Sequence, residues 1–469
     1  MKKNLVFVLS LVMLAFAACN SDDNNSSSLS NSVAFGVPSL NLTEATTPVQ
    51  IVFAKPTAVA GSLNISFATT AVTYGTDFTT TPAATANTLT IPFAANVSSV
   101  SFSFNKLTNA APTDVKNVKF TINEATDAAV TANNTIQVNF NETASLGQAL
   151  APVTGGPLQQ NQVYIDLSSG ASATALRTSW DLGFYSGTDF RVALNSSLKM
   201  AAKQLETTDI DQVQLPDETM IIAQGQGVYT QIDHPAGLIT GTAIAAVSDN
   251  DADNKVYLIN MGSNPSETAP AVGNDGSASG TSRGWKKVRV LKSGNDYKIQ
   301  YADIDATTHE EKIISKNSAF NFTFFSLTTK NVVNVEPQKN QWDLNFTTFT
   351  SLAGPTTPYY YADFVLTNLK GGARAYQILN NTGVTYDNFT MANLNTAAFT
   401  EDQRNIGSNW RSTSVPGPTG DPISQFVLKT DRFFVIKDPA GNIYKLKFTG
   451  GASETGERGY PKFQYALVQ

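Results

Sequence analysis

Few residues of this chain have the type or the spacing that chemistry requires. The two histidines, His234 and His309, are not at the spacing of a metal site, and no cysteine accompanies them, because Cys19 is the only one in the chain. No Ser–His–Asp set, GxSxG motif, phosphate-binding glycine loop or HExxH motif is apparent in the sequence. The sequence therefore predicts no catalytic residues and no metal site, and it favours a protein that is not an enzyme.

Cys19 stands where its thiol could carry a lipid. Two lysines precede a short apolar stretch, residues 5–15, which is too short to span a bilayer, and small residues come directly before the cysteine. This pattern resembles the lipobox of bacterial lipoproteins, and an ordinary secretory signal with an incidental cysteine is the alternative. We expect residues 1–18 to be a signal peptide and residues 19–32 to be a lipidated cysteine followed by a flexible, polar tether. The Ser-Asp-Asp after the cysteine resembles the export signal of Bacteroidetes surface lipoproteins, so we expect a lipid anchor in the outer membrane and display on the cell surface.

Composition limits the classes of partner. The formal net charge is -6, and no basic segment provides a surface for nucleic acid. Charged residues are only 15% of the chain, whereas Thr, Asn, Ser and Ala are frequent, as in β-rich extracellular proteins. The length predicts two to four domains.

Residues 33–142 are expected to form an immunoglobulin-like β-sandwich. Apolar and polar residues alternate there in six short segments separated by turn signals, and a period of two indicates strands with one buried face. The order of its motifs, including Leu42-Thr43-Glu44 and Tyr74-Gly75-Thr76-Asp77-Phe78, resembles a Calx-β domain. No calcium is expected, because the carboxylates of Glu44, Asp77 and Asp114 alone make a poor cage for an ion that prefers six to eight oxygens.

The remainder, residues 150–469, contains an internal duplication. Six alternating blocks occur in the same order in a first half, residues 158–305, and in a second half, residues 318–469. Every block has the alternation of a strand, so we expect this region to be all-β and antiparallel. We expect a domain boundary at the Pro/Gly-rich residues 151–157. The paired blocks are Val163–Ser169 with Phe322–Thr328, Trp180–Phe184 with Trp342–Phe346, Asp189–Asn195 with Asp363–Asn368, Lys255–Ile259 with Arg432–Ile436, Trp285–Val290 with Tyr444–Phe448, and Lys298–Ala302 with Lys462–Ala466.

A Trp–Asp pair starts the second block of each half. We expect Trp180 and Trp342 to lie in the core, and Asp181 and Asp343 to accept hydrogen bonds from backbone N–H groups at a strand start. These four residues are therefore interpreted as structural rather than catalytic.

Long excursions separate the third and fourth blocks at matched places. The first excursion runs from Ser196 to Asn254, and the second from Leu369 to Thr430. We expect short helices at Lys199–Val213 and Thr385–Asn395. In many proteins the regular strands form the scaffold, and the variable excursions between them carry the binding site.

The duplicated blocks resemble the HmuY family, surface lipoproteins of Bacteroidetes that capture haem. The resemblance rests on the strand Asp166–Gly170, on both Trp–Asp strands, and on the closing segment Val435–Phe448. It implies an all-β fold in which haem, or a porphyrin, is clamped by two histidine or methionine side chains from the segment after the Trp–Asp strand. It also implies a role in iron acquisition and an outer-membrane TonB-dependent receptor as partner.

Two features depart from that family pattern. The unit occurs twice, and no pair of histidines follows either Trp–Asp strand. In the first half the candidate haem ligands are Met200, Met220 and His234, whereas the second half offers only Met391. The alternative role for each methionine is packing in the hydrophobic core.

Two functions follow from the sequence. The first is capture of haem or a porphyrin for an outer-membrane receptor. The second is a non-enzymatic surface interaction protein that keeps the fold without haem and binds a protein or a glycan, for example through Tyr359-Tyr360-Tyr361. The sequence does not decide between them, and it leaves open the half that binds, the ligand pair and the oligomeric state.

Overall fold

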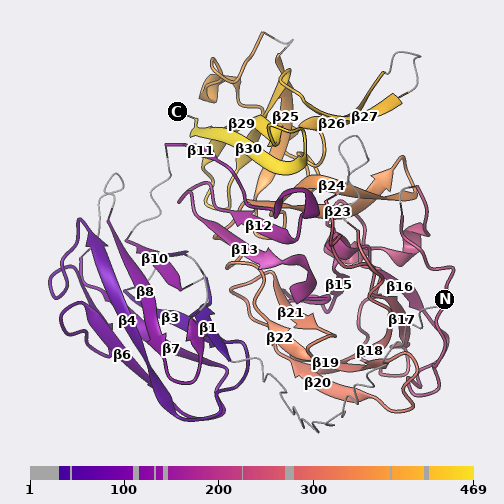
Figure 1. Ribbon diagram of the computed structural model, residues 1–469, viewed down its shortest axis with the longest axis horizontal. Helices are drawn as coiled ribbons and strands as arrows, with labels where there is room; N and C mark the ends of the chain where they lie inside the picture. Colours follow the sequence, from indigo (N-terminus) through magenta and orange to yellow (C-terminus); the bar gives the residue numbers. More distant parts are fainter. Residues whose placement is uncertain are drawn as a thin grey trace, which may run out of the picture.

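The molecule is built almost entirely of β-strands (Figure 1). The computed structural model describes residues 31–468 except 38, 43–44, 109–115, 131–133, 141–145, 224, 270–278, 381–382 and 417–421. Its regular elements are strands and short 3-10 turns, with no α-helix among the described residues, which confirms the all-β prediction. No helix in this part of the chain is long and apolar enough to cross a membrane. Cys19 and residues 20–30 of the predicted tether lie outside the described residues.

The N-terminal domain is a sandwich of two five-stranded sheets, as predicted. One sheet has the order β5-β7-β3-β1-β9, and the other has the order β2-β10-β8-β4-β6. Alternation places apolar side chains between the sheets, where the rings of Phe78 and Phe104 stack with centroids 4.9 Å apart. The strands are β1 (Ser32–Phe35), β2 (Ser39–Asn41), β3 (Thr46–Phe53), β4 (Gly61–Thr70), β5 (Phe78–Thr81), β6 (Thr88–Phe93), β7 (Ser99–Lys106), β8 (Asn117–Ala125), β9 (Ala129–Val130) and β10 (Thr135–Asn139).

Asp77, one of the three carboxylates considered for calcium, closes a turn of this sandwich. Its side chain accepts hydrogen bonds from the Thr73 N–H and from the Thr108 hydroxyl, both at 2.8 Å. Glu44 and Asp114 lie outside the described residues. That no calcium binds here stays a prediction.

The duplicated region contains two matched pairs of sheets. The four-stranded sheets have the orders β13-β12-β23-β24 and β22-β21-β14-β15, and the five-stranded sheets have the orders β11-β30-β29-β28-β25 and β20-β19-β18-β17-β16. A separate hairpin joins β26 to β27. The strands of the first half are β12 (Asn161–Ile165), β13 (Ser172–Leu176), β14 (Leu182–Tyr185), β15 (Val192–Leu194), β16 (Ala201–Gln204), β17 (Tyr257–Asn260), β18 (Trp285–Ser293) and β19 (Asp296–Asp303). The others are β11 (Ala149–Leu150), β20 (Glu310–Ile314), β21 (Phe322–Ser326), β22 (Asn331–Val333), β23 (Leu344–Ala353), β24 (Thr357–Thr367), β25 (Arg374–Leu379), β26 (Arg411–Pro416), β27 (Pro422–Leu428), β28 (Arg432–Lys437), β29 (Ile443–Ala452) and β30 (Arg458–Leu467).

The two halves exchange their first strands. β12 belongs to the first half but pairs with β23 of the second, and β21 belongs to the second half but pairs with β14 of the first. One hydrophobic core therefore draws on residues 182–327, and the other combines residues 163–167 with residues 344–465. We call β12 and β21 the exchanged strands.

The Trp–Asp pairs hold the exchanged strands in place. Asp181 accepts a hydrogen bond from the Leu327 N–H, just beyond β21, and Asp343 accepts one from the Leu167 N–H, just beyond β12, both at 2.7 Å. Each aspartate thus binds backbone from the other half. Trp180 and Trp342 are both 8% exposed.

The predicted alignment of the first blocks is wrong by one residue. Through their partners in β23 and β14, Val163 corresponds to Thr323 and not to Phe322, and Tyr164 corresponds to Phe324. Alternation alone does not choose between the two registers, because three of the five residues of β21 are phenylalanines.

The helix expected over Lys199–Val213 is wrong. Residues of β16 pair with β17, so the sheet provides the partners of their backbone groups and overrides local helix propensity. The residues Thr385–Asn395 contain only a single 3-10 turn, Met391–Asn393.

The Pro/Gly-rich segment expected as a boundary is packed against the second half. β11, directly before it, pairs with β30, and the buried Thr154 hydroxyl donates to the Gly459 carbonyl at 2.9 Å. The positions of the domain boundaries remain a proposal.

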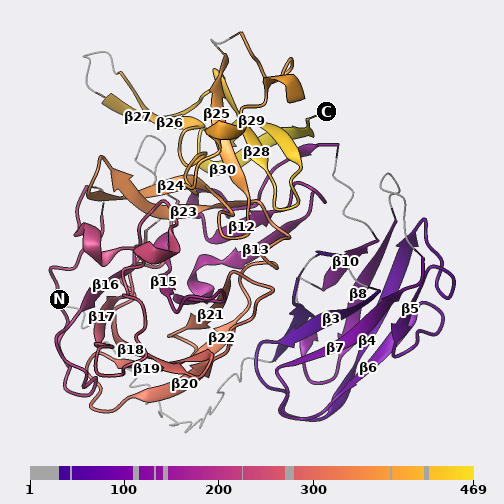
Figure 2. The ribbon, with the colours of Figure 1, turned by 180° about the vertical axis from the view of Figure 1, so that it is seen from behind.

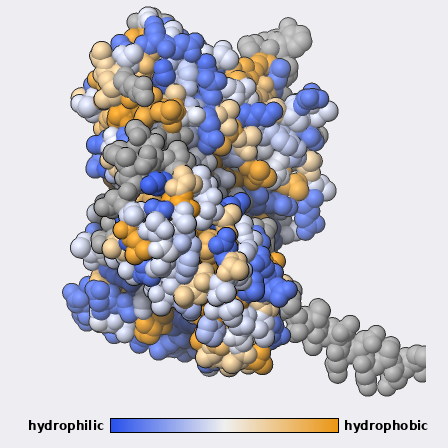
Figure 3. All heavy atoms as spheres, turned by 90° about the vertical axis from the view of Figure 1, so that its left-hand side faces the viewer, coloured by the Kyte–Doolittle hydropathy of each residue, from blue (hydrophilic) through white to orange (hydrophobic). Residues whose placement is uncertain are grey.

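The sandwich stands beside the duplicated region in both ribbon views (Figure 1 and Figure 2). Between them lies an open cleft of about 760 Å³, lined by both apolar and polar residues of β1, β13 and β22. On the face drawn in Figure 3, hydrophobic residues occur in separate small groups among hydrophilic ones.

Candidate ligand site between the two halves

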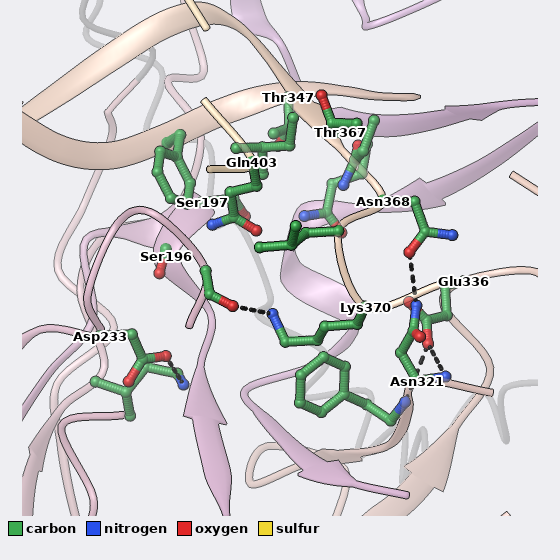
Figure 4. A pocket seen from close by; sticks show the side chains of 18 of the residues that line it. Ser196, Ser197, Asp233, Asn321, Glu336, Thr347, Thr367, Asn368, Lys370 and Gln403 are labelled. Atoms are coloured by element: carbon green, nitrogen blue, oxygen red, sulfur yellow. Dashed lines mark hydrogen bonds between the residues drawn. The ribbon is translucent and has the colours of Figure 1, made fainter. Parts of the chain in front are cut away.

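A cavity of about 140 Å³ lies where the four-stranded sheets meet, at the exchanged strands. Both excursions reach it. The first supplies His234 and Asp233, and the second supplies Lys370 and Gln403; Asp233, Lys370 and Gln403 are labelled in Figure 4. The Gln403 side chain donates to the Pro235 carbonyl at 2.9 Å, which ties the two excursions together. The scaffold and the excursions of both halves therefore form one site.

Aromatic rings form two walls of the cavity. Tyr164 packs edge-on against Trp342 with ring centroids 5.0 Å apart, and Phe324 packs edge-on against Trp180 at 4.7 Å. Each pair combines an exchanged strand with the tryptophan of the other half. Gln162 completes the wall beside Trp180 by accepting a hydrogen bond from its indole N–H at 3.0 Å.

Three buried polar atoms of the cavity lining have no hydrogen-bond partner within the described structure. They are the indole Nε1 of Trp342, the side-chain oxygen Oδ1 of Asn345 and the hydroxyl of Thr367, in residues that are 8%, 6% and 2% exposed. All three belong to the second half. The position that corresponds to Gln162 is occupied by Phe322, which has no acceptor for Trp342. Unpaired buried polar groups cost on the order of 1–3 kcal/mol each, so an occupant that hydrogen-bonds to these three atoms would be stabilised in the cavity.

A charged cluster lies at the same cavity. The Lys370 side chain extends between Asp233 on one side and Glu336 with Asn321 on the other (Figure 4). Its ammonium donates to the Gly237 carbonyl at 2.9 Å and lies 5.4 Å from the centre of the Phe322 ring. Burial lowers the pKa of Lys370, and the charges of Asp233 and Glu336 act in the opposite direction.

Burial also raises the pKa of both acids. The pKa of Asp233 is raised to about 6, although its carboxylate accepts the N–H groups of Leu194 and Ala243 at 2.7 and 2.8 Å. The pKa of Glu336 is raised to about 7 by burial, although one oxygen accepts the N–H groups of Asn321 and Phe322 at 2.9 and 3.0 Å. In both acids the cost of burying a charge outweighs these hydrogen bonds.

The raised pKa of Glu336 predicts a pH-dependent contribution to stability. Since the folded state binds this proton more tightly than the unfolded state, whose pKa lies near 4.5, the unfolding free energy should fall as pH rises from about 4.5 to 7. The substitution Glu336→Gln keeps an acceptor and removes the titration. Relative to wild type, the variant should therefore gain roughly 2–3 kcal/mol between pH 5 and pH 8, measured by urea unfolding. A difference that is the same at both pH values would contradict the assignment.

The structure does not bring the three candidate ligands together. His234 lines the cavity, and its Nδ1 accepts the Ala236 N–H at 3.3 Å. Met200 is 1% exposed and packs inside the core of residues 182–327. Met220 is 0% exposed and packs in a separate cluster with Ile222 and Leu258. Neither methionine is part of the cavity lining.

A haem clamped between two axial side chains does not fit these residues. The cavity is smaller than the roughly 300–1,000 Å³ of typical ligand pockets, and a porphyrin would need it to widen. His234 is the one imidazole or thioether side chain in its lining. Among the described residues no group of three or more His, Cys, Asp or Glu side chains is placed to hold a metal ion.

Three important residues of the site were missed from the sequence. Asp233 is adjacent to His234, and Lys370 follows Asn368 at the end of a repeated block, so the positions next to recognised motifs were the available signal. Glu336 does not lie next to a recognised motif, so its sequence position gave no such signal. The exchange of strands, which brings it to the cavity, is not visible in one sequence.

Both halves match one protein family. The HmuY protein family matches residues 158–317 and, a second time, residues 318–465. The chain belongs to the HmuY family. The two matches agree with the duplication inferred from the sequence. The two HmuY units of this chain exchange their first strands.

Other similarities are distant. No curated protein matches the chain. The apo form of a Calx CBD1 domain is 10% identical with a TM-score of 0.20, over 23% of this chain and 96% of that one. A two-domain protein of unknown function from Bacteroides fragilis is 9% identical with a TM-score of 0.18, over 65% of this chain and 93% of that one. A DUF4784 family protein from Bacteroides caccae is 8% identical with a TM-score of 0.11, over 92% and 95%. At such TM-scores these proteins say nothing about the ligand of this HmuY protein.

Proposed function

We propose that this HmuY protein is a non-enzymatic binding protein that captures a small ligand in the cavity between its two halves. The observation that carries the proposal is the set of three unpaired, buried polar atoms beside aromatic walls and a half-buried lysine. A ligand that pairs with these atoms removes their desolvation cost, which gives it an affinity that the open surface does not offer.

Occupancy can be tested with the two tryptophans of the cavity as reporters. We expect one-ring compounds to change the tryptophan fluorescence of the full chain and to raise its unfolding free energy, by about 2.7 kcal/mol at a concentration of 100 Kd. The variant Leu238→Trp is the matched control, because Leu238 lines the cavity and is 41% exposed, so a larger ring there should block entry without disturbing the core. Since the variant adds a tryptophan to the cavity, the two proteins are compared by their unfolding free energies, and an equal gain in both would place any binding elsewhere.

Haem is the second candidate ligand, favoured by HmuY family membership and by the imidazole of His234 in the cavity lining. Hemin titration separates the two candidates. A shifted Soret band that is lost in His234→Ala and retained in Met200→Ala and Met220→Ala would establish haem, with the first excursion displaced to admit it. No Soret shift in wild type is the result that the small-ligand proposal expects.

We further propose that the protein is anchored through Cys19 to the outer membrane, faces outward, and passes its ligand to a TonB-dependent receptor. The signal-like residues 1–18 and the polar residues after Cys19 support the anchor. Cys19→Ala should release the protein in soluble form and abolish incorporation of labelled palmitate. Membrane retention of the variant, with no label in the wild type, would refute lipidation.

A further inference from the structure

We infer that the cavity is built for a ligand that carries a carboxylate on a single ring, or on an apolar group of similar size, and that Lys370 binds the carboxylate. This inference rests on the proposed function and adds the chemical class of the ligand. It follows from the size of the cavity, from its hydrogen-bonding groups and from its charges.

The size of the cavity selects a one-ring ligand. An engineered apolar cavity of about 150 Å³ in another protein binds benzene, and this cavity measures about 140 Å³. The rings of Trp180, Trp342 and Phe322 provide apolar surface for such a group. A tetrapyrrole is several times larger and is excluded while the excursions stay in place.

The unpaired groups favour a ligand that carries several hydrogen-bond acceptors. The indole N–H of Trp342 can only donate, and the hydroxyl of Thr367 can donate. The ammonium of Lys370 has three donors, and within the described residues its one hydrogen bond goes to Gly237. Only the side-chain oxygen of Asn345 needs a donor. A carboxylate offers about four acceptor sites and suits this excess of donors.

The hydrogen bonds that the charged groups already make favour an anion over a cation as the ligand. Both oxygens of the Asp233 carboxylate already accept backbone N–H groups, and Glu336 accepts two with one oxygen. Within the described structure, Lys370 makes its hydrogen bond to a neutral carbonyl, so its ammonium is free to form a charge-assisted bond with a ligand. Such bonds are roughly twice as strong as those between neutral groups.

Calorimetric titration of the full-length protein with benzoate and benzamide tests the inference, because the two probes differ mainly in charge. We expect benzoate to bind wild type roughly tenfold or more tightly than benzamide. In Lys370→Met, which keeps the length of the side chain and removes its charge, this preference should disappear while benzamide still binds. Benzylammonium should bind neither protein.

A second variant covers the case in which Lys370→Met does not fold. Trp342→Phe keeps a ring in the wall and removes the unpaired N–H, so it should weaken benzoate several-fold. Equal affinity of benzoate and benzamide in wild type, or a preference that survives Lys370→Met, would overturn the carboxylate inference. The proposed function would still stand if Leu238→Trp blocked the binding. If no small probe bound wild type, and ordered water alone filled the cavity, both the carboxylate inference and the proposed function would be refuted.

Discussion

Neither half of the duplicated region should fold when it is produced alone. A fragment of residues 158–317 lacks β21. In this fragment β14 therefore keeps β15 but loses its neighbour on the other side, and the Asp181 carboxylate loses the hydrogen bond from the Leu327 N–H. The same fragment keeps β12 without β23, which leaves an apolar strand with an unpaired edge. We expect this fragment to show no cooperative urea transition and no near-ultraviolet circular dichroism.

The matched control is a fragment of nearly equal length whose ends are chosen to include the whole first hydrophobic core, rather than one sequence repeat. Residues 180–333 contain every buried residue of the first core, including Phe325 and Leu327 from the second half. This fragment should unfold cooperatively, and an equimolar mixture of residues 158–317 and 318–465 should assemble into a folded complex. Cooperative folding of isolated 158–317 would contradict the strand exchange.

Asp181→Ala should destabilise the protein by about 3–5 kcal/mol, because it breaks a buried ion pair on one side only. Asp181 pairs with Arg283 at 2.7 Å, and their side chains are 0% and 6% exposed. The substitution leaves the guanidinium without its counter-charge and the Leu327 N–H without its acceptor. Urea unfolding of the full chain measures the effect.

Two further variants separate the contributions at Asp181. Asp181→Asn keeps an acceptor for the Leu327 N–H but removes the charge, so it should cost less than Asp181→Ala. Arg283→Met, combined with Asp181→Ala, removes the stranded cation and should restore part of the lost stability. Additive effects of the two single substitutions would show that the pair does not act as a unit.

Strand positions in the duplicated region were predictable because they depend on a local signal. All six pairs of blocks fall on strands or their ends, since alternation at a period of two and the repeated Trp–Asp motif lie within a few residues of one another. The pairing partners were not predictable. Alternation shows which face of β12 is buried, but it carries no information on whether its neighbour is β14 or β23.

The candidate site was less predictable than the fold. His234 was identified and lines the cavity, whereas Met200 and Met220 were equally plausible from the sequence and lie in apolar packing. A methionine in a core and a methionine beside a ligand have the same local pattern. Lys370 reaches the cavity only because the second excursion folds over the exchanged strands, and that depends on contacts between residues far apart in sequence.

The exchange of strands also sets an order of events during synthesis, because every chain is made from its N-terminus. β12 leaves the ribosome early, but β23, with which it pairs, follows only after the residues of the first core have been made. During this interval Val163 and Ile165, which are 1% exposed in the finished protein, have no apolar partner. The growing chain therefore presents an apolar strand to its surroundings until β23 has been made, and an exposed strand of this kind is prone to aggregation.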